Sequence, residues 1–147
     1  MFGLSSMRRA LLGFLVLVFC AGPALAEVRI EASSGGEATS FLAYFELVRR
    51  SGERVVIDGP CFSACTLVLD IVPRRRICVT PRAVLGFHAA KMIDQLGEEF
   101  PAPRATRIVA DAYPAPIRHW IERHGGLTTR PIFLSGRELD AIYPLCR

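Results

Sequence analysis

Hydrophobic and polar positions change their spacing several times along the chain, and each change predicts a new element. Residues 28–32 alternate as in a β-strand. Over residues 37–50 the apolar positions instead recur at helical spacing. The short β-branched run 54–58 predicts a buried strand. An apolar stretch follows over residues 63–72 and predicts a second helix that ends before Pro73.

The second half of the chain continues this alternation with more helix. Three further short strands are predicted, at residues 77–79, 83–87 and 131–134. Three helices are predicted at residues 104–113, 117–124 and 136–142. Strands that alternate with helices are typical of an α/β domain. We therefore expect a small α/β domain with a mainly parallel sheet and flanking helices.

The N-terminal residues have the pattern of a cleavable secretory signal peptide. Arg8 and Arg9 precede an apolar run at residues 10–21, and Gly22-Pro23 separates that run from the small-residue pattern of residues 24–26. The sequence thus predicts a signal peptide at 1–26 and one domain at 27–147. A membrane anchor is the alternative, but the run is short for a span of about 20 residues. A lipid anchor on Cys20 would require a small residue in place of Phe19.

The net charge does not indicate a nucleic-acid partner. The formal charge of the whole chain is +4, and Arg8 and Arg9 would leave with the signal peptide. The remaining basic residues are scattered except for the triplet 74–76, which we interpret as a solvated turn between a helix and a strand. We expect no nucleic-acid binding and no stable membrane span after cleavage.

Four cysteines lie after the predicted cleavage point: Cys61, Cys65, Cys78 and Cys146. An even number of cysteines in an exported chain favours two disulfides, whose pairing the sequence leaves open. A zinc site is the alternative, but the spacing is a poor match because no second close pair of cysteines follows. We expect a disulfide-stabilised periplasmic or secreted protein without a metal.

Three features indicate a single chemical site. Ser63 lies where a strand turns into a helix, where the unpaired N–H of Ala64 could stabilise an oxyanion. Gly35-Gly36 follows another strand and could bring a second N–H to that point. His88 ends a third strand and carries the imidazole that a serine nucleophile needs. Each feature also has an ordinary structural explanation, as a helix cap, a turn or a packed histidine.

The order of these motifs resembles the ClpP/crotonase superfamily, and within it the small bacterial periplasmic proteins described as ClpP-like. The Ser-Pro-Gly-Gly pattern of ClpP is matched by Ser33-Ser34-Gly35-Gly36. Its Gly-x-x-x-Ser segment is matched by residues 59–63, and its histidine strand by residues 84–88. Residues 133–139 resemble the Phe-Leu-Ser segment near the C-terminus of the family.

The resemblance implies a role for each matching residue. Ser63 would be the nucleophile, His88 the general base, and the N–H groups of Gly36 and Ala64 the oxyanion hole. One departure is clear, because Pro131 stands where the family has its catalytic aspartate. The carboxylates considered as substitutes are Asp94, Asp111 and Asp140. A Ser–His dyad is the other interpretation.

We therefore expect an exported ClpP-like serine hydrolase of the peptidase or esterase type, acting on a peptide or a small ester. The alternative is a catalytically inactive protein that keeps the fold as a periplasmic binding or structural module. We expect no cofactor, since coenzyme A chemistry of the crotonase kind is not expected outside the cytoplasm. The resemblance is compatible with a homo-oligomer, although the chain is shorter than a ClpP subunit.

Overall fold

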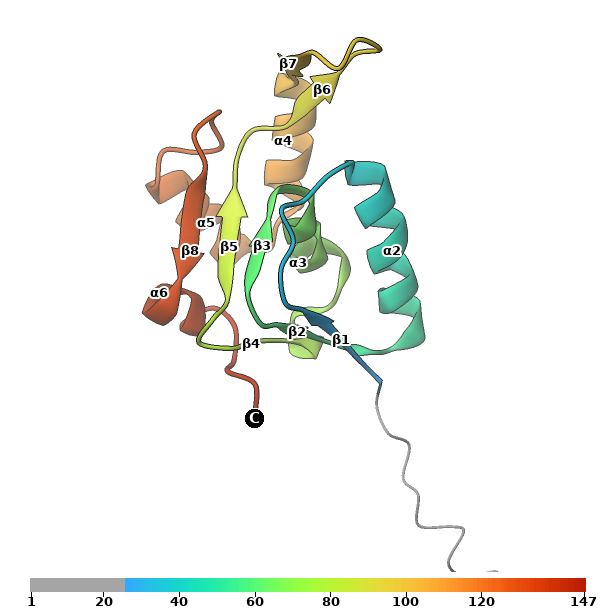
Figure 1. Cartoon of the computed structure of the whole chain (residues 1–147). Coiled ribbons are helices and arrows are strands. Elements are labelled where there is room, and N and C mark those ends of the chain that lie inside the picture. Colours follow the sequence, from blue (N-terminus) through green and yellow to red (C-terminus); the bar gives the residue numbers. More distant parts are fainter. Residues whose placement is uncertain (1–25) are drawn as a thin grey trace, which may run out of the picture.

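The computed structural model describes residues 26–147, which fold into an α/β structure with two disulfides (Figure 1). Residues 1–25, and with them nearly all of the predicted signal peptide, lie outside the described residues. Within the described part, no helix combines the length and the apolar character that crossing a membrane requires.

Two small sheets form the centre of the structure. The first contains three parallel strands in the order β1 (Glu27–Ile30), β2 (Arg54–Ile57) and β4 (Ile77–Val79). The second has the order β3 (Pro60–Phe62), β5 (Val84–Phe87) and β8 (Ile132–Ser135), in which β5 is parallel to β3 and antiparallel to β8. The expected mainly parallel sheet is therefore not confirmed, because the strands form separate and partly antiparallel sheets.

The two sheets are joined by short connections. Only Asp58 and Gly59 separate β2 from β3, so the chain passes from one sheet directly into the next. In Figure 1, β3, β5 and β8 run upright, and β2 and β4 cross at their lower end. A Cβ atom on Gly59 would lie 1.9 Å from the Glu31 carbonyl oxygen, so only glycine allows this close crossing. The crossing places the start of β3 beside the end of β1.

Helices cover both sheets. The long helix α2 (Ala38–Ser51) places Phe45 and Val48 in the core. The predicted helix over residues 63–72 divides into a 3-10 helix, η2 (Ser63–Leu67), and a short α3 (Val68–Ile71). The remaining helical segments are η3 (Arg74–Arg76), α4 (Pro103–Ala112), α5 (Ala115–Arg123) and α6 (Gly136–Asp140). Trp120 of α5 packs against Phe87 of β5 with the ring centroids 5.9 Å apart.

The hairpin of β6 (Lys91–Ile93) and β7 (Glu99–Pro101) is not among the predicted elements. All six of its strand residues are exposed, so burial imposes no alternation of apolar and polar positions that a sequence pattern could reveal. The hairpin follows β5 and extends away from the sheets beside α4 (Figure 1).

The expected disulfides are confirmed, and the structure resolves their pairing. Cys61 pairs with Cys65 and Cys78 pairs with Cys146, so no thiol among these four is left for the alternative zinc site. The second bridge spans 68 residues and holds the C-terminal segment against β4. In the chain-entropy model, closing a loop of that length stabilises the fold by about 4 kcal/mol.

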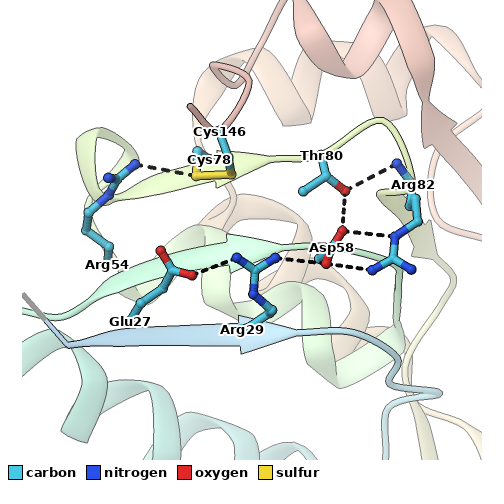
Figure 2. The surroundings of a disulfide bond; sticks show 8 residues. All are labelled: Glu27, Arg29, Arg54, Asp58, Cys78, Thr80, Arg82 and Cys146. Atoms are coloured by element: carbon cyan, nitrogen blue, oxygen red, sulfur yellow. Dashed lines mark hydrogen bonds and ion pairs between the residues drawn. A yellow bond between two sulfur atoms is a disulfide. The ribbon is translucent and has the colours of Figure 1, made fainter.

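Asp58, which directly follows β2, forms ion pairs and hydrogen bonds with neighbouring segments (Figure 2). Its carboxylate accepts hydrogen bonds from Arg82, Thr80 and Arg29, which come from the turn before β5 and from β1. The hydrogen bond from Arg82 is the largest of the influences that hold the pKa of Asp58 far below its ordinary value of 3.8. The carboxylate therefore links three segments of chain at the point where the two sheets meet.

We predict that Asp58 makes the fold sensitive to acid. Because its pKa is lower in the folded than in the unfolded chain, its contribution is present near neutral pH and is lost as the pH falls below about 5. Asp58→Asn should lower the free energy of unfolding at pH 7, with a difference from the wild type that shrinks towards pH 3. Urea unfolding followed by the fluorescence of the buried Trp120 measures this difference.

Asp140→Asn is the matched control, since Asp140 is exposed and makes no ion pair within residues 26–147. The interpretation of Asp58 is wrong if the two variants show the same dependence of unfolding on pH.

Candidate functional site

The structure brings the predicted site residues to one cavity of about 660 Å³. Ser63, His88, Gly36 and Ala64 all line it, although they come from three separate segments of the chain. The apolar part of the wall is formed by side chains from several elements: Ala38, Leu67, Ala90, Ile93 and Val109. Lys91 and Glu99 of the exposed hairpin also line the cavity, where they form an ion pair of 2.5 Å.

Ser63 adopts an unusual backbone conformation where β3 turns into η2. Its φ is 54°, and it is the one non-glycine residue with positive φ within residues 26–147. Such a left-handed conformation costs an L-residue about 1–3 kcal/mol and persists only where the surroundings hold it. A serine on a strained strand-to-helix turn is typical of hydrolases that expose a nucleophilic hydroxyl.

A disulfide and two strand contacts hold this turn. The Cys61–Cys65 bridge closes a small ring around residues 62–64. On the other side, the loop after β1 runs alongside β3, where the Ser33 N–H donates to the Pro60 carbonyl at 2.8 Å. The Phe62 N–H donates back to the Ser33 carbonyl at 2.9 Å. The turn is thus fixed both covalently and by backbone hydrogen bonds.

Gly35 lies directly against the serine turn. A Cβ atom on Gly35 would lie 2.5 Å from the Ser63 Cβ and 2.6 Å from the Phe62 carbonyl oxygen. It would also lie 3.1 Å from the Ala64 backbone nitrogen. The predicted approach of the Gly35-Gly36 loop to the serine is therefore seen in the structure, and it requires a residue without a side chain.

Two backbone N–H groups at this contact are free to bind a ligand. Within residues 26–147, the N–H groups of Gly36 and Ala64 have no hydrogen-bond acceptor. For Ala64 this follows from its place at the start of η2, because the first N–H groups of a helix have no acceptor within it. Both residues line the cavity that Ser63 also lines. Paired donors of this kind can stabilise an oxygen that develops negative charge.

His88 is oriented by the main chain and not by a carboxylate. Its Nδ1 lies 2.7 Å from the carbonyl oxygen of Ala89. A carbonyl oxygen can only accept, so Nδ1 carries the proton and donates. In the neutral ring Nε2 then has a free lone pair, which is the form that a general base requires.

Within residues 26–147, none of the three carboxylates considered as substitutes for the missing aspartate is hydrogen-bonded to His88. Asp94 accepts hydrogen bonds from the N–H groups of Leu96 and Glu98 in the hairpin turn. Asp111 and Asp140 lie exposed on α4 and α6, with no side-chain hydrogen bond to His88 within residues 26–147. Pro131 directly precedes β8 and has no carboxylate to offer. Within the same residues, no hydrogen bond joins the Ser63 hydroxyl to His88.

Thr66 and Tyr113 also belong to the site, and sequence reasoning missed both. Thr66 Oγ1 lies 2.6 Å from the Ser63 carbonyl oxygen and 2.6 Å from the Tyr113 hydroxyl. Burial is the main cause that raises the pKa of Tyr113 to about 12, so this phenol keeps its proton at neutral pH. Thr66 could have been suspected from its spacing of three from Ser63. Nothing in the sequence connects Tyr113 to a serine 50 positions earlier.

The described residues contain no group of three or more His, Cys, Asp or Glu side chains that could hold a metal ion. No protein-family model matches the sequence, and a search of curated proteins found no match either.

We predict that an alanine at Gly35 disrupts the serine turn. Gly97→Ala measures separately the free-energy cost of placing an alanine at a positive φ. Gly97 has a φ of 84°, and no atom lies within 4 Å of an added Cβ. Gly35 has nearly the same φ, 86°, but its Cβ would overlap the turn. Gly35→Ala should lower the free energy of unfolding by about 1–3 kcal/mol more than Gly97→Ala.

Urea unfolding of the two variants gives this difference. Equal destabilisation would contradict the contact, since it would mean that the turn accommodates the methyl group without moving.

Proposed function

We propose that this protein is an exported ClpP-like serine hydrolase that cleaves a peptide or a small ester through an acyl-enzyme on Ser63. The observation that carries the proposal is that one cavity is lined by Ser63, by His88, and by Gly36 and Ala64, whose N–H groups have no acceptor within residues 26–147. The resemblance of the motif order to the ClpP/crotonase superfamily supports the same reaction. Two disulfides suit an oxidising compartment, and they support a periplasmic or secreted location.

The proposed reaction uses only side chains and backbone groups of the chain. Ser63 Oγ attacks the carbonyl carbon of the substrate while His88 Nε2 takes the hydroxyl proton. The negative oxygen of the tetrahedral intermediate accepts hydrogen bonds from the N–H groups of Gly36 and Ala64. The intermediate collapses as His88 returns the proton to the departing amine or alcohol. Water then hydrolyses the ester on Ser63 by the same steps, so no cofactor is needed.

The Ala89 carbonyl supplies part of what a catalytic aspartate supplies. It holds the imidazole ring in place and selects the tautomer in which Nε2 is the base. It carries no full negative charge, so it stabilises the imidazolium that forms during the reaction less than a carboxylate would. In a serine protease, replacing the aspartate by an amide lowers kcat by about 10⁴-fold, and the wrong tautomer is the cause. Because the tautomer here is the productive one, we expect a slow but measurable enzyme.

The second candidate is a catalytically inactive module that uses the same cavity for binding. The observation that favours it is that the Ser63 hydroxyl and His88 are not hydrogen-bonded to each other within the described residues. Hydrogen bonds of this kind are often loose in a structure without substrate and tighten when it binds. Reactivity at Ser63 therefore separates the two functions better than the geometry does.

We predict that a fluorophosphonate probe labels Ser63. The protein is purified with both disulfides formed, and intact mass spectrometry follows the labelling rate. Ser63→Ala should abolish the adduct, and His88→Ala should slow labelling by about 10²-fold or more, the usual contribution of a general base. Ser135→Ala should label at the wild-type rate, because Ser135 also precedes a short helix but lies outside the cavity.

The hydrolase proposal fails if the wild type is labelled no faster than Ser63→Ala. That outcome, together with binding of a peptide or ester ligand that Leu67→Trp blocks, would favour the inactive module.

A further inference from the structure

Two buried hydroxyl groups connect the end of α4 to the serine turn. Thr66 is fully buried in η2, and Tyr113 is 3% exposed immediately after α4. Their oxygens lie 2.6 Å apart, and Thr66 Oγ1 lies a further 2.6 Å from the Ser63 carbonyl oxygen. The three oxygens thus form a hydrogen-bonded relay, in which Tyr113 lies 47 positions after Thr66 in the sequence.

The chemistry of the groups determines the direction of this relay. The Ser63 carbonyl oxygen can only accept, so the single hydroxyl proton of Thr66 is donated to it. Thr66 Oγ1 then has lone pairs but no proton left for its second neighbour. Tyr113 must therefore be the donor of the other bond. The protons run from Tyr113 to Thr66 and from Thr66 to the Ser63 carbonyl.

The last acceptor of this relay shares a peptide plane with the proposed oxyanion donor. The carbonyl of Ser63 and the N–H of Ala64 belong to the same peptide bond, which is trans because the described chain contains no cis bond. In a trans peptide the C=O and N–H bonds are coplanar and point in opposite directions. A hydroxyl that holds the Ser63 oxygen on one side therefore holds the Ala64 N–H on the other.

We propose that Tyr113 and Thr66 are positioning residues that orient the Ala64 N–H towards the substrate oxygen in the cavity. This inference rests on the proposed hydrolase function. Neither side chain acts on the reacting atoms in this scheme; each acts through the Ser63–Ala64 peptide.

Two further properties of the relay support this role. Hydrogen bonds in a chain polarise one another, so donation to the Ser63 carbonyl strengthens the Ala64 N–H as a donor. The relay also holds Ser63 in the left-handed conformation that its φ of 54° requires. Because burial raises the pKa of Tyr113 to about 12, the first donor of the relay stays protonated across the physiological range.

The test compares fluorophosphonate labelling rates for variants that change one hydroxyl each. Tyr113→Phe keeps the ring, whose edge contact with Phe87 has a centroid distance of 5.4 Å, and removes only the donor. It should slow labelling of Ser63 by about fivefold, the effect of one lost neutral hydrogen bond. Thr66→Val should slow it at least as much, and Thr66→Ser should restore it, because serine keeps the hydroxyl.

Tyr143→Phe is the matched control. Tyr143 is buried like Tyr113, but within residues 26–147 its hydroxyl has no hydrogen-bond partner and it does not line the cavity. This variant should label at the wild-type rate. Tyr113 itself lines the cavity, so it could instead contact the substrate directly. The relay is overturned if Tyr113→Phe slows labelling while Thr66→Val does not.

Nuclear magnetic resonance tests the relay without relying on reactivity. Tyr113→Phe should shift the Ser63 carbonyl and Ala64 amide resonances, whereas Tyr143→Phe should leave both unchanged. If Tyr113→Phe leaves them unchanged, the relay is wrong whatever the labelling rates show. If the wild type is never labelled but Tyr113→Phe shifts these resonances, the hydrolase proposal and the catalytic role of the relay are both refuted. The shifts would still confirm that the two hydroxyls orient the Ser63–Ala64 peptide.

Discussion

The backbone at Ser63 has a left-handed conformation that an L-residue keeps only when its neighbours hold it. Here the neighbours are a glycine packed against the turn, a disulfide that closes around it, and a threonine hydroxyl bonded to its carbonyl. The glycine comes from the loop after β1, whereas the disulfide and the threonine lie within the few residues around the turn itself. The strand crossing at Gly59 and the ion pairs of Asp58 matter to the site because they place β3 beside the loop that carries Gly35.

The elements that bury an apolar face could be predicted from the sequence. Helix α2 and strand β2 lie within a residue or two of their predicted bounds, because burial of one face imposes a regular spacing. The parallel sheet was not confirmed, since the short strands separate into two sheets and β8 runs antiparallel to β5. The exposed hairpin was missed because no burial constrains its sequence.

The candidate site likewise contains residues that the sequence pattern could identify and residues that it could not. Ser63, His88 and the glycine pair could be found because each follows a strand and carries a distinctive residue type. The Ala89 carbonyl that orients His88 could not be found, since a main-chain acceptor leaves no mark in the sequence. Tyr113 is a further case, because its role depends on where α4 ends relative to η2, which is set by packing between distant segments.

The central claim is that this rigid turn makes Ser63 a nucleophile. It is tested most directly by mixing the protein with an activated ester, quenching in acid and locating the acyl group by peptide mass spectrometry. The account predicts an acyl group on the peptide that contains Ser63, formed faster than it is hydrolysed and absent from Ser63→Ala. An equal amount of acylation in Ser63→Ala, or an acyl group found only on lysines, would contradict it.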